Sequence, residues 1–150
     1  MPENFIPPHA KLLIITRAPW LILRSQYRLG WLRKEEVPTG QDFFQYHAND
    51  ICQTLLVNHE TGHHMARLHP ENVLVLRYED VMGDFDVTMG RLFPFIGEPL
   101  MPSLLTRLRE IKERNIMPSY GKNFDITPEA AEQHVRQVDS CNRVITLYGY

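Results

Sequence analysis

The chain has 150 residues, of which 43% are hydrophobic and 23% charged, and its formal net charge is −2. This composition fits one globular domain with enough apolar residues for a core. Lys and Arg total 16 against 18 Asp and Glu, which excludes a general nucleic-acid binder, because such a protein needs a clear basic excess. No apolar run approaches the roughly 18 residues of a membrane span, so the sequence predicts no membrane segment.

The first half of the chain predicts a strand and two helices. Residues 11–16 are apolar and partly β-branched, which predicts a strand buried on both faces, as in a parallel sheet. Apolar residues at helical spacing from Pro19 to Trp31 predict a helix, with Pro19 in its first turn. Residues 34–42 predict a surface connection, and residues 44–68 predict a second helix that Pro70 ends.

The second half continues the alternation of strands and helices. The predicted elements are a buried strand at 73–77, a helix at 84–96 kinked at Pro94, a short helix at 104–111, a loop at 115–126 and a last helix at 127–147. Thr127 and Pro128 suit the start of that last helix as capping hydroxyl and first-turn proline. Together the elements predict an α/β fold, a parallel sheet flanked by helices.

Cys52 and Cys141 are the two cysteines of the chain. They lie far apart in sequence and are free to pair, but a single bridge is not a disulfide framework. We therefore expect a cytoplasmic, reducing compartment. The Golgi lumen is the alternative if the chain is a fragment of an anchored enzyme.

A cation and a hydroxyl follow the first predicted strand. Arg17 stands at its carboxyl end, where parallel sheets bind ligands, and Ser25 lies eight residues further on. The start of the next helix offers N–H groups and partial positive charge to a phosphate, and Arg17 can add a bidentate, charged fork. The residues alone leave open a phosphate site or an Arg17 ion pair beside an ordinary helical serine.

The segment from Lys11 to Pro19, with Ser25 and Tyr27, resembles a signature of the sulfotransferases. These enzymes use the sulfate donor PAPS (3′-phosphoadenosine 5′-phosphosulfate) and have a P-loop NTPase-like fold. The resemblance implies that Arg17 and Ser25 bind the 3′-phosphate of this donor. Ala18 stands where the family usually has Asp or Asn, so a turn-stabilising side chain is missing there.

Residues 73–99 resemble a second sulfotransferase signature, a strand followed by an Arg-Tyr-Glu-Asp turn and a helix. In the family the tyrosine of this turn lies near the adenine, which implies that Tyr78 binds the adenine. Glu79 and Asp80 are compatible with a structural role as well, and Pro94 departs from the family's pattern.

The end of the chain resembles the family's cofactor-covering loop and terminal helix, from Leu108 to Tyr150. Lys122 in this loop is a candidate contact to the donor phosphate, and a solvated lysine is the alternative.

The family's P-loop has no counterpart in the sequence, because no Gly-x-x-x-x-Gly-Lys turn occurs. In the family this loop precedes the Arg17-type strand and binds the 5′-phosphosulfate through nested N–H groups and a lysine. The general base also lies upstream there. The resemblance therefore implies that residues 1–150 are a single domain truncated at its amino-terminal side. We expect it to bind the 3′-phosphate and adenine side of the donor and, alone, to transfer little.

A zinc peptidase is the alternative enzyme class. His59-Glu60-x-x-His63 is a literal H-E-x-x-H, and His69 stands where metzincins have their third ligand. That pattern needs a glycine where this chain has Ala66. If the helix continues to residue 68, His69 lies about 15 Å along the axis from His59, too far for one metal.

We therefore expect a sulfotransferase that passes sulfuryl from PAPS to a hydroxyl or amine of a small molecule or carbohydrate, without a metal. The expected partners are this nucleotide donor and the acceptor, with no nucleic acid. A non-catalytic binding module is the further alternative.

Overall fold

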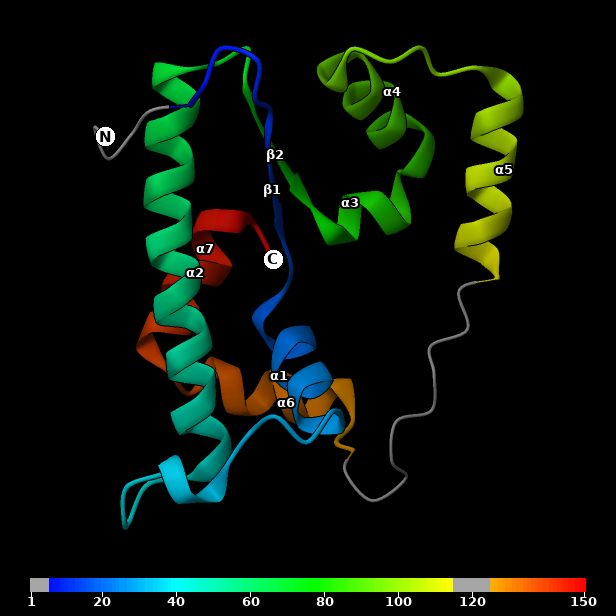
Figure 1. Ribbon diagram of the computed structural model, residues 1–150. Coiled ribbons are helices and arrows are strands. Elements are labelled where there is room, and N and C mark those ends of the chain that lie inside the picture. Colours follow the sequence, from blue (N-terminus) through cyan, green and yellow to red (C-terminus); the bar gives the residue numbers. More distant parts are fainter. Residues whose placement is uncertain (1–5, 115–124) are drawn as a thin grey trace. The chain divides into compact units, whose positions relative to one another are not determined.

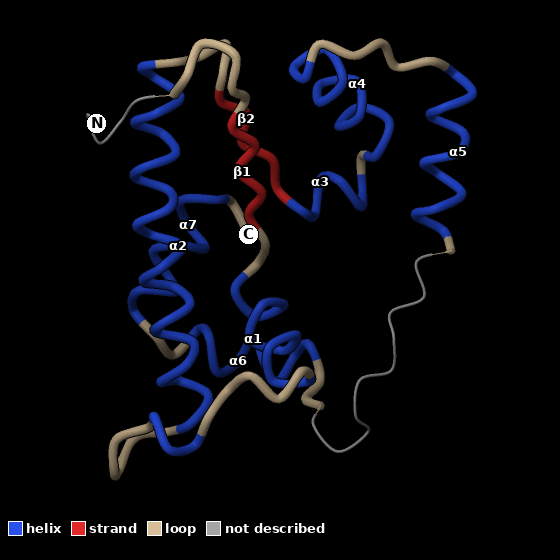
Figure 2. The backbone as a smooth tube through the Cα atoms, viewed as in Figure 1, coloured by secondary structure: helices blue, strands red, loops and turns tan. Residues whose placement is uncertain are grey.

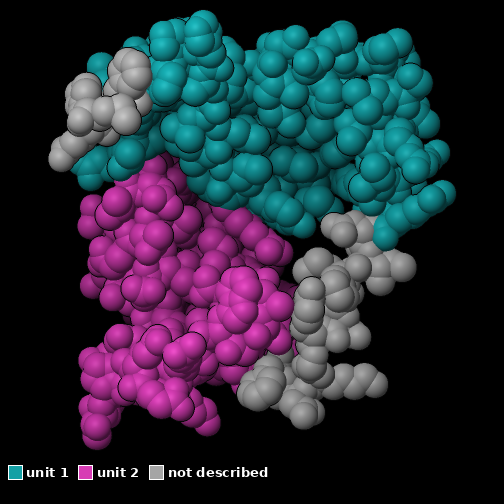
Figure 3. All heavy atoms as spheres, viewed as in Figure 1, with its two compact units in different colours: residues 1–16, 60–117 teal, residues 17–59, 118–150 magenta. Residues whose placement is uncertain are grey.

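The computed structural model describes residues 6–114 and 125–150, which form parts of two compact units (Figure 3). Unit 1 consists of Met1–Thr16 and Glu60–Met117, and unit 2 of Arg17–His59 and Pro118–Tyr150. Lys122 and most of the predicted loop lie outside the described residues.

Unit 1 contains a two-stranded parallel sheet (Figures 1 and 2). Its elements are β1 (Leu12–Thr16), the second part of α2 (Phe43–Leu68), β2 (Val73–Arg77), α3 (Tyr78–Gly83), α4 (Phe85–Ile96) and α5 (Pro102–Glu113). The strands pair in register from Leu12 opposite Val73 to Thr16 opposite Arg77. The structure thus confirms an α/β protein with a parallel sheet.

The expectation that β1 is buried on both faces is wrong. Side chains alternate across a strand, and Ile14 and Thr16 share one face. Thr16 is buried, and Ile14 packs beside a small core of Ile6, Met65 and Val73. Leu13 and Ile15 share the other face and are 37% and 57% exposed. An apolar run does not reveal whether a second layer covers it.

A glycine of α2 permits close packing between this helix and β1. A Cβ atom built on Gly62 would lie 2.9 Å from Cδ1 of Ile14, closer than such atoms approach. Gly62 is itself buried within the helix. A Cβ atom at this position would require the end of the Ile14 side chain to shift.

Two helices follow β2 where the sequence predicted one. α3 begins at Tyr78, directly after the strand, and α4 begins after Asp84. Pro94 lies within α4, three residues before Gly97, whose φ of 81° ends the helix. Glycine suits this left-handed conformation because it has no Cβ atom.

Unit 2 is a helical assembly with its own core. Its elements are α1 (Pro19–Arg28), a 3₁₀ turn at Lys34–Glu36, the first part of α2, α6 (Pro128–Arg136) and α7 (Asp139–Tyr148). The fully buried side chains of this core come from all four α-helices and include Leu23, Cys52, Val135, Cys141 and Val144.

Two predicted helices of unit 2 are shorter in the structure. The first ends at Arg28, because Gly30 takes a φ of 68° and leaves Trp31 outside, 66% exposed. The predicted last helix is two helices, since Val138 adopts an extended conformation between α6 and α7. Its start is as predicted, with the Thr127 hydroxyl accepting a hydrogen bond from the Ala130 N–H at 3.1 Å.

None of the helices in the described part of the chain combines the length and apolar character that crossing a bilayer requires.

A disulfide joins Cys52 of α2 to Cys141 of α7, across 89 residues of sequence. Both cysteines are fully buried in the core of unit 2. The sequence left this pairing open, because only the fold places two distant residues together. The bridge restricts the conformations of the unfolded chain, which raises the free energy of the unfolded state and thereby stabilises the folded unit.

We expect reduction of this disulfide to lower the free energy of unfolding by about 4 kcal/mol, since the closed loop is long. In a chain of 150 residues this corresponds to a fall in Tm of about 10 °C. Thermal unfolding with and without reductant measures the effect. The Cys52→Ala/Cys141→Ala variant serves as control, because its Tm should not respond to reductant. Equal melting of the oxidised and reduced wild type would contradict the prediction.

Candidate functional site

Arg17 lies in the connection between β1 and α1, as the sequence predicted. It follows Thr16, the last residue of the strand, and α1 begins two residues later at Pro19. The side chain is half-buried, and its Nε atom is fully buried. The first turn of α1 carries no acidic residue, so nothing there repels an anion. A guanidinium group at a helix start suits a phosphate.

Ser25 is in α1, on the same side of the helix as its N-cap residue Ala18. The two residues are seven positions apart, which is two helical turns. Ser25 is half-buried and lies about 9 Å along the axis from Pro19. Arg17 and Ser25 therefore belong to one unit, with Arg17 in the strand-to-helix connection and Ser25 within the helix that follows it.

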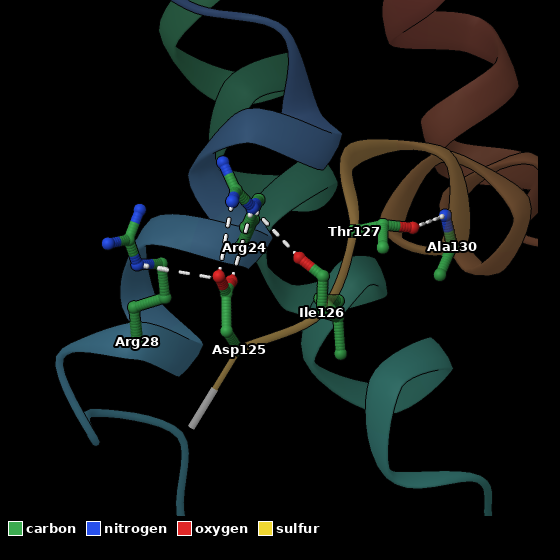
Figure 4. A network of polar contacts seen from close by, with 6 residues as sticks. All are labelled: Arg24, Arg28, Asp125, Ile126, Thr127 and Ala130. Carbon is green, nitrogen blue, oxygen red and sulfur yellow. Dashed lines mark hydrogen bonds and ion pairs between the residues drawn. The ribbon is translucent and has the colours of Figure 1, made fainter. Parts of the chain in front are cut away.

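Two other arginines of α1 bind an aspartate from far along the chain (Figure 4). Arg24 donates two hydrogen bonds of 3.2 Å to the Asp125 carboxylate and a third, of 2.8 Å, to the carbonyl oxygen of Ile126. Arg28 lies 3.9 Å from the same carboxylate. This network fastens the segment before α6 to α1 and neutralises part of the positive charge of that helix.

Arg77 and Asp80 of the second signature bind each other. Nε and Nη2 of Arg77 donate to the two oxygens of the Asp80 carboxylate at 3.0 and 2.7 Å. The Arg77 hydrogen bond, with the charges of Arg77 and Arg91, lowers the pKa of Asp80 below its usual 3.8, although partial desolvation opposes this. The backbone oxygen of Asp80 accepts the hydroxyl of buried Thr88 at 3.1 Å. Asp80 thus ties β2, α3 and α4 together.

Tyr78 is the residue that follows the last pair of the sheet on the β2 side. Thr16 and Arg77 form that pair, so both strands end at the same level. Tyr78 opens α3 and is half-buried. It belongs to unit 1, whereas Arg17 and Ser25 belong to unit 2.

The histidines of the H-E-x-x-H sequence occupy a continuous helix. α2 runs without a break to Leu68, so Ala66 does not form the sharp turn that would return His69 to the other two. The ring of His59 packs edge-on against Tyr148, with 4.9 Å between centroids. Across residues 6–114 and 125–150, no three or more His, Cys, Asp or Glu side chains gather in a way that could hold a metal ion.

A parallel strand pair with an arginine after one strand and an Arg-Tyr-Glu-Asp segment after the other is the framework of the site. A family model described as "Sulfotransferase domain" matches residues 1–124, and the chain therefore belongs to the sulfotransferase family. No curated protein and no solved structure matches it.

Sequence reasoning missed the partners of three arginines. Arg77 and Asp80 are three residues apart, a spacing that places side chains together on a helix, so a local signal was present. Arg24 and Asp125 are separated by 101 residues, and nothing near either of them indicates the other.

We expect Asp80→Asn to lower the free energy of unfolding by about 0.5–1 kcal/mol at pH 7, the range for a partly exposed ion pair. Because the folded-state pKa of Asp80 is depressed, its contribution is full above its usual value of 3.8 and is lost as pH falls through the lower folded-state pKa. Urea unfolding of wild type and variant from pH 7 to pH 3 measures the difference.

Asp84→Asn is the matched control, because Asp84 is exposed and its side chain does not cap α4. A stability difference for Asp80→Asn that grows as pH falls would show that the ion pair is not its source.

Proposed function

We propose that this sulfotransferase-family chain binds the 3′-phosphate and adenine of PAPS and has the P-loop NTPase-like form of the fold. The observation that carries the proposal is the junction of β1 and α1, with Arg17 between the two elements and Ser25 on the helix. It combines a charged fork, a helix start free of acidic residues and a hydroxyl on the face above that start. These groups match the charge and the hydrogen-bond acceptors of a phosphate.

The alternative for Arg17 and Ser25 is an ion pair beside an ordinary serine. A phosphate gives Arg17 a function that its place after a parallel strand favours.

Tyr78 is the residue that we propose to lie against the adenine. An aromatic ring offers a flat apolar face to a base, and stacking of this kind contributes about 1–3 kcal/mol. Its position directly after β2 supports this role, because parallel sheets bind ligands at the carboxyl ends of their strands.

The proposed reaction is transfer of sulfuryl from PAPS to an acceptor hydroxyl or amine, with the nucleotide bisphosphate as leaving group. Arg17, Ser25 and Tyr78 would bind and orient the donor. We propose that they leave the 5′-phosphosulfate end unheld, because the 150 residues contain no Gly-x-x-x-x-Gly-Lys sequence. This chain alone is then a binder of the donor's nucleotide end with little transferase activity.

The nucleotide site can be tested by thermal-shift titration with adenosine 3′,5′-bisphosphate and with adenosine 5′-monophosphate. We expect the bisphosphate to stabilise the wild type. Arg17→Ala should weaken bisphosphate binding about tenfold or more, and Ser25→Ala about fivefold, because each loses hydrogen bonds to a charged group. Neither variant should alter the weaker binding of the monophosphate, which lacks the 3′-phosphate.

Arg33→Ala is the control, since Arg33 is an exposed arginine of the same unit outside this connection. A bisphosphate affinity that Arg17→Ala leaves unchanged would overturn the phosphate assignment. An equal loss for both nucleotides would show that Arg17 contacts something other than the 3′-phosphate.

We also propose that the chain works in an oxidising compartment, such as the Golgi lumen, rather than in the cytoplasm. The support is the disulfide between Cys52 and Cys141, which are both fully buried. Glutathione and thioredoxin keep cysteines of cytoplasmic proteins reduced, so a structural disulfide there is rare. The composition does not distinguish the two compartments, but the bridge favours the oxidising one.

Thiol trapping in the source cells tests the compartment. Free thiols are alkylated with N-ethylmaleimide before lysis, and the peptides that contain Cys52 and Cys141 are examined by mass spectrometry. We expect a disulfide-linked pair without alkylation. Alkylation of both cysteines would place the protein in a reducing compartment.

A further inference from the structure

A polar groove in unit 2 lies apart from the Arg17–Ser25 connection. It has a volume of about 570 Å³ and lies where the start of α2 meets the junction of α6 and α7. The side chains that give it its chemistry are Gln41, Asp42, Gln45, Tyr46, Asn49 and Gln137. Four of these six side chains end in a carboxamide group, namely Gln41, Gln45, Asn49 and Gln137. Neither lysine nor arginine lines the groove.

The amide groups of the groove are held in place by neighbouring side chains. The side-chain NH₂ of Gln45 donates a hydrogen bond to Oε1 of Gln137, and Oδ1 of Asn49 accepts the Ser140 hydroxyl at 2.8 Å. A carboxamide group has two N–H donors and an oxygen that accepts two hydrogen bonds. One hydrogen bond therefore uses only part of the hydrogen-bonding capacity of the group. The Gln137 and Asn49 NH₂ groups and the Gln45 carbonyl oxygen thus have capacity for a ligand.

The carboxylate of Asp42 is also fixed. Its Oδ1 accepts the backbone N–H of Gln45 at 2.9 Å and lies 3.7 Å from Nδ1 of His134. Tyr46 follows Gln45 in α2, is half-buried, and adds a flat ring and a hydroxyl to the wall of the groove. The groove therefore presents fixed donors, fixed acceptors and one aromatic surface.

This chemistry selects among ligand classes. An anionic ligand such as a nucleotide or a sulfated chain would meet the Asp42 carboxylate without a lysine or arginine in the lining. An apolar ligand would leave the amides without partners, which costs binding free energy. A neutral polyhydroxyl ligand fits, because each hydroxyl both donates and accepts, as each amide does.

We propose that this groove binds a neutral oligosaccharide. Vicinal hydroxyls would bind the Gln45, Asn49 and Gln137 amides and Asp42, and an apolar sugar face would lie on Tyr46. If the proposed sulfuryl transfer is correct, the groove anchors a glycan acceptor away from the reacting group. That role rests on the proposed function, but the binding itself does not.

Titration of the ¹⁵N-labelled full chain tests the proposal directly, because side-chain NH₂ groups give their own NMR signals. The probes are chitohexaose, maltohexaose and lacto-N-tetraose as neutral oligosaccharides, and a heparin hexasaccharide as an anionic one. We expect at least one neutral probe to shift the NH₂ signals of Gln45, Asn49 and Gln137. The signals of Gln53 and Gln133, exposed glutamines outside the groove, should stay in place.

Gln137→Ala and Asn49→Ala should each weaken the binding of that probe about fivefold, the loss of one to two hydrogen bonds. Gln133→Ala is the matched control and should bind as the wild type does, and thermal melting confirms that all three variants are folded. The proposal is overturned if no neutral probe binds, if only heparin binds, or if the groove variants bind like the control. Arg17→Ala should leave oligosaccharide binding unchanged, so failure of the nucleotide proposal and failure of this one are distinguishable.

Discussion

The parallel pairing of β1 with β2 is the constraint on which the candidate donor site depends. Pairing in this register sets Thr16 opposite Arg77, and each strand leads at once into a helix. Parallel neighbours need a long crossover between them, and the residues between β1 and β2 provide it with α1 and α2. Arg17 and Tyr78 are candidates because each directly follows the carboxyl end of a parallel strand. In an arbitrary loop, an arginine and a tyrosine would not by themselves indicate a ligand-binding site.

The features of this fold that the sequence predicts are those that depend on short-range interactions. The strands, α2 and the Thr127 cap were predictable because apolar periodicity and capping chemistry are local signals. The exposure of Ile15, the bridge between Cys52 and Cys141 and the Arg24–Asp125 pair depend on what lies across space. For the candidate site, the chain positions of Arg17, Ser25 and Tyr78 were predictable, and the packing partners of the neighbouring arginines were not.

The H-E-x-x-H sequence lies within the continuous helix α2. A helix interior tolerates glycine poorly, yet Gly62 stands inside α2, where a Cβ atom would lie 2.9 Å from Cδ1 of Ile14 of β1. Beyond Gly62, α2 continues through Ala66 to Leu68. The continuity that brings the helix against the strand is also what keeps His69 from joining His59 and His63.

Two surfaces of unit 2 differ in their charge and therefore in the ligands that they favour. On α1, Arg24 and Arg28 bind Asp125, and Arg17 lies just before the start of this helix. At the start of α2, Asp42 faces a groove whose other polar groups are neutral amides. An anion therefore gains at the first surface and loses at the second, while a hydroxylated neutral chain does the reverse. A nucleotide donor would bind at the first surface and a glycan acceptor at the second, so the two ligands would not compete for one surface.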